Sequence, residues 1–181
     1  MANLERLKRL LICADPAAPM QHIYWLIPEK IGGRCGPAVA GWDLAAWKQA
    51  GIRAIVSLDE TQVSTWQIQD AGIAHLPIYW PMIELTSHAL QRDFVQRLPA
   101  IFRFLDEHSQ DGDKVVVHCY HGLDRTGAVL ACYLVYRHGS TPKEAITAVR
   151  KLRPQALSAY GYAQAVHLFA EQVGGLFSHQ H

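Results

Sequence analysis

A cysteine and an arginine with five residues between them are the pair in this sequence best suited to covalent chemistry. Cys119 and Arg125 lie in the stretch H-C-Y-H-G-L-D-R-T-G, residues 118–127, which directly follows three valines. A thiolate is a strong nucleophile, and a guanidinium holds two oxygens of a phosphate-like anion with its planar fork. The spacing therefore predicts a site where a cysteine attacks the phosphorus of a bound phosphate ester.

The residues between this cysteine and this arginine are suited to binding the anion through the backbone. Gly122 permits tight curvature, so that successive N–H groups point at one centre beside the N-terminus of the helix that follows. A thiol at the base of such a nest of partial positive charge is favoured as the thiolate. The phosphate-binding residues that we predict are Tyr120, His121, Gly122, Leu123, Asp124 and Arg125.

Three further residues of this stretch are expected to assist. Thr126 can offer its hydroxyl to the Cys119 sulfur and so stabilise the thiolate when a phosphocysteine is hydrolysed. His118 can orient the loop by hydrogen bonds to backbone carbonyls, and Gly127 completes the motif. Because the N–H groups and the arginine neutralise the phosphate charge, we expect no metal and no cofactor. The substrate is then a phosphorylated protein or a small phosphate monoester.

The motif H-C-x5-R-T-G, placed after a β-branched strand and before an apolar helix, resembles the signature loop of the cysteine-dependent protein tyrosine phosphatases. The chain is similar to a small, atypical dual-specificity phosphatase of that superfamily from roughly residue 22 to 170, most clearly at 115–154. The resemblance implies a parallel-centred sheet flanked by helices. It also implies hydrolysis of phosphate monoesters through a phosphocysteine. Because the chain has few insertions to build deep pocket walls, we expect phosphotyrosine and phosphoserine or phosphothreonine to be accepted.

The general acid departs from the pattern of this superfamily, which usually takes it from an aspartate on a mobile loop upstream of the cysteine. The corresponding stretch, 80–86, has Glu84 as its only carboxylate. Asp124, inside the signature loop, gives C-x-x-G-x-D-R-T, which is similar to myotubularin-type phosphoinositide phosphatases, where this aspartate is thought to be the acid. A nearby phosphate dianion favours a protonated carboxyl. We expect Asp124 to be the acid, with Glu84 in reserve; alternatively, Asp124 caps the following helix.

Several other functions are compatible with parts of the motif. The loop similarity to myotubularins keeps phosphoinositides and inositol phosphates as alternative substrates, although the loop lacks lysines for a polyanionic headgroup. The missing loop aspartate allows a non-catalytic phosphate-binding pseudophosphatase, and a similar anion loop serves rhodaneses and arsenate reductases. A metal site at His118, Cys119 and His121 is disfavoured, because residues 118 and 119 point to opposite faces of a strand.

Hydrophobic patterns predict strands that alternate with helices along the chain, followed by a helical C-terminal part. Pro77 indicates an edge strand, Pro99 a helix kink, and the turn-forming residues 31–37 a loop. The pattern predicts an α/β fold with a mostly parallel central sheet flanked by helices. The predicted strands are 22–27, 52–58, 73–79 and 114–118, and the predicted helices are 43–50, 61–71, 86–109, 126–138, 142–152 and 158–173.

Bulk properties place this chain in the class of single-domain globular proteins. Its 181 residues suit one domain, 1–181, in which residues 1–20 form an N-terminal helical extension with Leu4, Leu7, Leu10 and Leu11 on one face. A formal net charge of +1 argues against nucleic-acid binding, and no apolar run is long enough for stable membrane insertion. Four cysteines without a C-x-x-C pair favour a reducing cytoplasm. The sequence indicates no oligomeric state.

Overall fold

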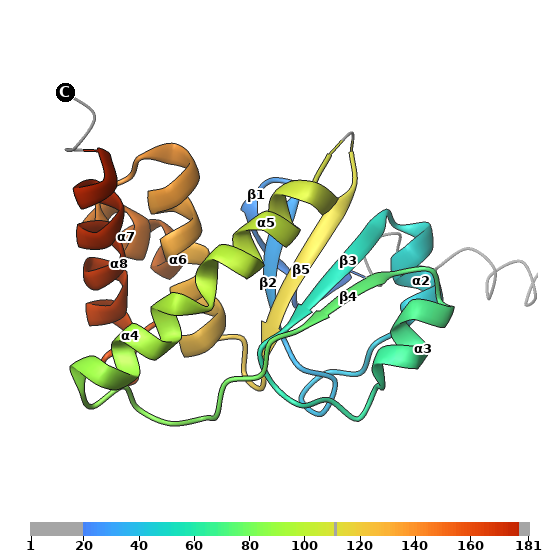
Figure 1. Ribbon diagram of the computed structural model, residues 1–181. Coiled ribbons are helices and arrows are strands. Elements are labelled where there is room, and N and C mark those ends of the chain that lie inside the picture. The colour runs from blue at the N-terminus through green and yellow to red at the C-terminus, as the bar shows by residue number, and fades with distance from the viewer. Residues whose placement is uncertain (1–19, 111, 178–181) are drawn as a thin grey trace, which may run out of the picture.

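The strands of the computed structural model form one five-stranded sheet in the order β1-β2-β5-β3-β4 (Figure 1). The structure describes residues 20–110 and 112–177. Strand β1 is antiparallel to its neighbour β2, and the other four strands are parallel, which confirms the predicted mostly parallel sheet. The strands are β1 (Tyr24–Ile27), β2 (Ile31–Cys35), β3 (Ile52–Ser57), β4 (Ala74–Pro77) and β5 (Lys114–Cys119).

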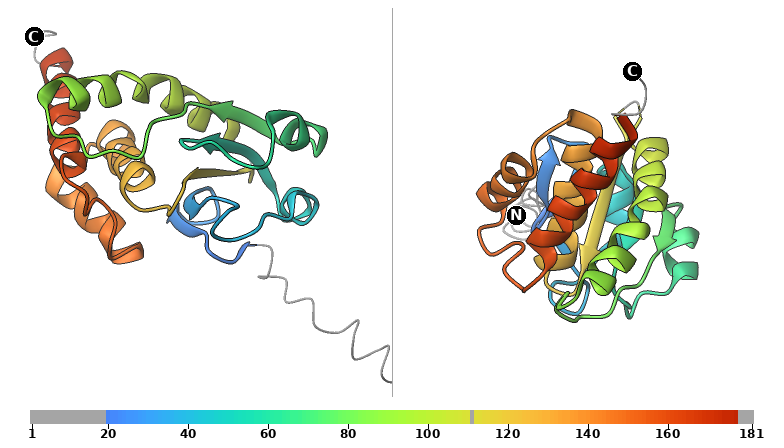
Figure 2. Two further views of the ribbon diagram at one scale, coloured as in Figure 1. Left: turned by 90° about the horizontal axis from the view of Figure 1, so that it is seen from below. Right: turned by 60° about the vertical axis from the view of Figure 1, so that its left-hand side comes forward.

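Helices cover both faces of the sheet in unequal numbers. Two short ones, α2 (Leu44–Gln49) and α3 (Thr65–Asp70), lie on one face (Figure 1). The other face carries α4 (His88–Gln96), α5 (Leu98–His108), α6 (Asp124–His138), α7 (Pro142–Leu152) and α8 (Tyr162–Phe177). Figure 2 shows α6, α7 and α8 gathered at one end of the molecule, the helical C-terminal part that the sequence predicts.

Two hydrophobic cores fill the space between these layers, and strand β5 contributes to both. Val115, Val117 and Cys119 belong to the larger core, under α4–α8, while Val116 belongs to the smaller core, under α2 and α3. Successive side chains of a strand point to opposite faces. His118 accordingly lies on the side of the smaller core, where its ring packs edge-on against Trp42, which borders that core. The strand therefore delivers Cys119 and His118 to opposite sides of the sheet.

The predicted loop 31–37 is wrong, because residues Ile31–Cys35 form strand β2 next to β5. Turn-forming glycines explain the error, since here they serve packing instead of chain reversal. A Cβ atom on Gly32 would lie 2.7 Å from the Ile23 side chain, and a Cβ atom on Gly33 would overlap the ring of Tyr24. The glycines thus let the large side chains of the β1 region lie directly across β2.

The predicted helix 86–109 is also wrong in one respect, because the structure has two helices there, α4 and α5. Pro99 has no N–H with which to continue the hydrogen-bond ladder of α4, which ends at Gln96. The proline is instead accommodated in the first turn of α5. Arg97, the single residue between the two helices, keeps helical backbone angles (φ −84°, ψ −19°), so the interruption is short and lies close to the predicted kink.

Apart from the helix predicted at 86–109, three helices begin two or more residues from the predicted start. Helix α3 begins at Thr65, four residues late, because Ser64 forms a capping box with Gln67. Helix α6 begins at Asp124 instead of residue 126. Helix α8 begins at Tyr162 instead of residue 158, directly after Gly161, which has a φ of +87°.

The predicted N-terminal helical extension, 1–20, falls almost entirely outside the described residues. Within the described ranges, no helix combines the length and the apolar character needed to cross a membrane.

Candidate active site

The carboxyl ends of the parallel strands bring three loops together at one edge of the sheet. Leu58 follows β3 and donates its N–H to the carbonyl of His118 in β5, at 2.9 Å. Trp80 follows β4 and donates to the carbonyl of Leu58, also at 2.9 Å. The loop after β5 leads into α6. Ligands of parallel α/β sheets bind at this edge, and it is here that Cys119 and Arg125 lie.

The carbonyl groups of residues 119–123 each accept a hydrogen bond, three of them from residues far away in the chain. The pairs are Cys119 O with His118 Nδ1 (3.3 Å), Tyr120 O with Gly36 N (2.9 Å), His121 O with Arg153 Nη2 (3.4 Å), Gly122 O with Tyr24 Oη (2.9 Å) and Leu123 O with Gly127 N (2.8 Å). Within the described residues, the N–H groups of 120–123 donate to no other group. This is the arrangement that the predicted anion nest requires, because the free N–H groups are left to bind a phosphate.

Two of these donors are side chains that differ in burial, since Tyr24 is half-buried and Arg153 is exposed. Burial raises the pKa of Tyr24, so its hydroxyl keeps the proton that it donates to Gly122. Arg153, which lies directly after α7, donates to the carbonyl of His121. Both donors lie far from the loop in the chain; the position of Arg153 before Pro154 suggests such a bracing role, whereas nothing near Tyr24 in the sequence does.

Gly122 is required by both its backbone conformation and its surroundings. Its φ of +67° lies in the left-handed region, and a Cβ atom there would lie 2.5 Å from the backbone carbon and oxygen of Arg34. Only glycine lets the loop pass this close to strand β2.

We expect Gly122→Ala to destabilise the fold and to remove anion binding. Left-handed φ costs an alanine about 1–2 kcal/mol, and the contact with a rigid strand adds to this. Thermal denaturation with and without inorganic phosphate measures both effects. Gly139→Ala is the matched control: Gly139 has a φ of +63°, but nothing lies within 4 Å of its added Cβ, so phosphate binding should survive. Equal phosphate binding by both variants would contradict the role given to the loop shape.

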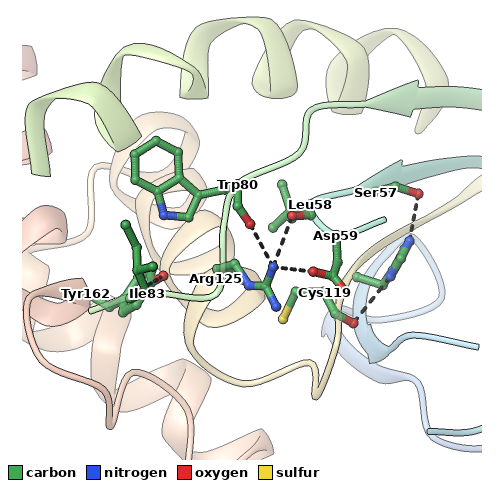
Figure 3. A network of polar contacts seen from close by, with 9 residues as sticks. Ser57, Leu58, Asp59, Trp80, Ile83, Cys119, Arg125 and Tyr162 are labelled. Atoms are coloured by element: carbon green, nitrogen blue, oxygen red, sulfur yellow. Dashed lines mark hydrogen bonds and ion pairs between the residues drawn. The ribbon is translucent and has the colours of Figure 1, made fainter. Parts of the chain in front are cut away.

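Arg125 is buried beside the cysteine and is held by one of its nitrogens (Figure 3). Its Nη1 donates to Asp59 Oδ1 at 2.6 Å, to the Trp80 carbonyl at 2.8 Å and to the Leu58 carbonyl at 3.3 Å. Within the described part of the chain, its Nε and Nη2 have no hydrogen-bond partner, so two donors remain for an anion. Asp59 is a site residue that the sequence reasoning missed; its position directly after a predicted strand was the available signal.

The Cys119 side chain is buried at the base of the loop, only 2% exposed. The predicted help from Thr126 is not seen: its hydroxyl is buried and has no hydrogen-bond partner among the described residues, the Cys119 sulfur included. Thr126 lies in the first turn of α6. His118 behaves as predicted toward one carbonyl, that of Cys119.

The loop that carries Glu84 is anchored over the site. The carbonyl of Ile83 accepts from the Tyr162 hydroxyl at 2.9 Å, and Leu85 N donates to the Tyr160 carbonyl at 2.9 Å. Burial raises the pKa of Tyr162 to about 12, so this hydroxyl remains a donor. Glu84 is exposed and lines the same small cavity, of about 180 Å³, as Cys119 and Arg125.

Asp124 lines this cavity too, but one of its oxygens is engaged elsewhere. Its Oδ1 accepts from Ala159 N at 2.9 Å and from Ser158 Oγ at 3.4 Å. The alternative that Asp124 caps the helix is wrong, because the cap position is Leu123 and no side chain bonds there. Asp124 instead ties the start of α6 to the segment before α8.

Two other cavities lie outside the one that contains Cys119. One of about 320 Å³ lies beside Tyr120 and is lined by Asp59 and Glu60. A larger one, of about 850 Å³, is lined by residues of α4, α5, α6 and α8 and contains neither Cys119 nor Arg125. Within 20–110 and 112–177, no cluster of three or more histidine, cysteine or acidic side chains could hold a metal ion.

Several proteins similar to this chain are named as phosphatases. Human dual specificity protein phosphatase CDC14C is 26% identical over 142 residues, which cover 72% of this chain and 30% of that protein. The crystal structure of Tk-PTP in the active form has a TM-score of 0.71 at 24% identity and covers 84% of this chain and 98% of its own. That of PTPMT1 in complex with PI(5)P has a TM-score of 0.64 at 18% identity and covers 86% and 99%.

A family model also matches most of the chain. This chain spans less than a third of the length of the first curated relatives that it matches. Residues 39–172, however, match the family described as dual specificity phosphatase, catalytic domain, and this range contains every loop of the site. The chain belongs to the dual specificity phosphatase catalytic-domain family.

Proposed function

We propose that this protein hydrolyses phosphate monoesters of proteins through a phosphocysteine intermediate. The observation that carries the proposal is the loop 119–123: each of its carbonyls accepts a hydrogen bond, while within the described residues the N–H groups of 120–123 are free beside the Cys119 thiol and two unpaired nitrogens of Arg125. A dianionic phosphate is the ligand that such a set of donors fits. The thiol at its base supplies the nucleophile.

The reaction proceeds in two displacements at phosphorus. The Cys119 thiolate attacks the phosphorus, so that an S–P bond forms as the ester P–O bond breaks, and the departing oxygen takes a proton from a carboxylic acid. Water then attacks the phosphocysteine and gives a proton to the same carboxylate, which releases inorganic phosphate and the thiolate. The loop N–H groups and Arg125 stabilise the charge on the equatorial oxygens in both steps.

Charge around the site supports phosphorylated side chains as the substrate class. The cavity beside Tyr120 is lined by Asp59 and Glu60, and the catalytic cavity by Glu84 and Asp124. These carboxylates would repel the additional phosphates of a polyphosphorylated headgroup. The small cavity, about 180 Å³, accommodates a phosphorylated side chain and little more.

A phosphoinositide is the second candidate substrate. It is favoured by the fold similarity to PTPMT1, which was crystallised in complex with PI(5)P. A monophosphorylated headgroup carries a single phosphate monoester and would meet less repulsion from the four carboxylates than a polyphosphorylated one.

The proposal is tested by phosphate release from para-nitrophenyl phosphate, with and without vanadate. We expect turnover that vanadate blocks. Side-by-side assays with phosphotyrosine peptide, phosphoserine peptide and PI(5)P vesicles then rank the substrates, with the peptides expected to be faster. If none of these substrates is hydrolysed but inorganic phosphate still binds, the proposal of an enzymatic function is wrong. The protein would then be a phosphate-binding pseudophosphatase.

We propose Asp124 as the general acid and Glu84 as the reserve, and the two are separated by amide substitutions. With an alkyl phosphate, whose leaving group needs a proton, we expect Asp124→Asn to lower kcat by on the order of 10²-fold and Glu84→Gln by less. Because Asp124 Oδ1 also ties down residues 158–159, the thermal stability of each variant must be measured alongside. Asp93→Asn, which removes a carboxylate from an exposed α4 ion pair, is the matched control and should be unchanged. A larger loss in Glu84→Gln would reverse the assignment.

A further inference from the structure

A continuous chain of side-chain hydrogen bonds runs from the carbonyl of Cys119 to the edge strand β4. His118 Nδ1 contacts the Cys119 carbonyl at 3.3 Å, and His118 Nε2 contacts Ser57 Oγ at 2.7 Å (Figure 3). Ser57 Oγ also contacts His75 Nε2 at 2.8 Å, and His75 Nδ1 contacts Thr65 Oγ1 at 2.9 Å. Ser57 and His118 are fully buried, and His75 is half-buried.

The donor and the acceptor of each of these hydrogen bonds can be assigned by starting at the Cys119 carbonyl. A carbonyl can only accept, so His118 Nδ1 carries a proton. Burial lowers the pKa of His118 to about 3, so the ring is neutral and its Nε2 accepts from the Ser57 hydroxyl. The Ser57 oxygen is then free to accept, and the proton comes from His75 Nε2. Each member thus fixes the orientation of the next.

The inner end of the chain determines how one peptide group of the anion nest is turned. Because a trans peptide is planar, a Cys119 carbonyl held by His118 directs the N–H of Tyr120 to the opposite side. Without a partner on Nε2, the His118 ring can take the other tautomer, in which Nδ1 has no proton to donate. The carbonyl would then be released, and the peptide group next to the nucleophile would be free to rotate.

We propose that Ser57 and His75 are positioning residues that hold the Cys119–Tyr120 peptide group in its anion-binding orientation through His118. The proposal rests on the proposed function, since it assigns them to the same phosphate site. Neither residue lines the cavity that contains Cys119. They act through His118 and do not touch the substrate.

The test compares His75→Phe, which keeps an aromatic ring but has no donor, with His75→Gln, whose amide nitrogen can replace His75 Nε2. We expect His75→Phe to lower kcat/KM by about ten-fold and Ser57→Ala, which leaves a buried imidazole nitrogen unpaired, by about 100-fold. His75→Gln should recover activity to within about two-fold of wild type. His138→Phe, on the exposed end of α6, is the matched control and should match wild type.

Two measurements that do not require turnover test this proposal separately from the proposal that the protein is a phosphatase. They are the rate of Cys119 alkylation by iodoacetate at one fixed pH and the affinity for inorganic phosphate, each compared with the melting temperature. If His75→Phe lowers both the alkylation rate and the phosphate affinity, and His75→Gln restores both, the positioning role is supported even if no substrate is hydrolysed. Unchanged alkylation and phosphate binding in His75→Phe would overturn it. The proposal would also be wrong if both variants lost alkylation rate and phosphate affinity equally, in proportion to a fall in melting temperature. Such losses would come from disturbed packing alone.

Discussion

Cys119→Ser is expected to lower kcat by on the order of 10⁴-fold or more, because it removes the nucleophile and keeps the shape of the loop. A serine hydroxyl stays protonated where a thiol ionises, so it cannot attack phosphorus at a useful rate. The variant should still bind inorganic phosphate, since every donor of the nest is backbone or belongs to Arg125. Phosphate release from para-nitrophenyl phosphate and calorimetric binding of phosphate measure the two properties separately.

The control for this substitution is Cys132→Ala. Cys132 is fully buried in α6, and burial raises the pKa of its thiol, which keeps it unreactive. Its loss should reduce thermal stability and leave kcat unchanged. If Cys119→Ser keeps more than about one hundredth of the activity, a route without phosphocysteine is operating.

Arg125→Lys has the second largest expected effect, a fall in kcat/KM on the order of 10³-fold. The guanidinium performs two tasks with different nitrogens: Nη1 is bonded to Asp59, Leu58 and Trp80, which leaves Nε and Nη2 for the phosphate. A lysine ammonium is a single point of charge and cannot satisfy both sets of partners. We therefore expect both a higher KM and a lower kcat in steady-state assays.

Two companion variants show whether the loss comes from this double role. Arg137→Lys makes the same change on the same helix at an exposed ion pair with Asp106, and should have no effect on turnover. Asp59→Asn keeps an acceptor for Nη1 but removes the charge, so a fall of about ten-fold is expected. A loss of less than ten-fold in Arg125→Lys would show that the backbone nest alone binds the transition state.

The parts of the site that could be predicted are those that are continuous in the sequence. Strand β5, the loop and helix α6 follow one another directly. The sequence spacing of Cys119, Gly122 and Arg125 therefore determines how these residues lie relative to one another. The alternation of β5 also correctly placed His118 and Cys119 on opposite faces. Fold class followed from the same local patterns, since strands and helices alternate along most of the chain.

The parts that could not be predicted depend on contacts between distant segments. Tyr24 and Gly36 hold two of the loop carbonyls, but nothing near these residues in the sequence marks the contact. The same holds for Asp124, whose bonds to residues 158–159 arise only once the helices have packed. Strand β2 was missed for a related reason, because the glycines that look like turn formers are explained by side chains of another strand.

The position of β5 in the sheet has a consequence for how the protein folds. It is the last strand in the sequence but lies in the middle of the sheet, and it alone joins the β1–β2 pair to the β3–β4 pair. While the chain is being synthesised, these pairs remain separate two-stranded units with exposed apolar edges, which are only marginally stable and prone to aggregate. Insertion of β5 closes the sheet and brings Cys119 to its edge in the same event. We therefore expect chains truncated before β5 to aggregate readily, and the phosphate nest to form only when the sheet is complete.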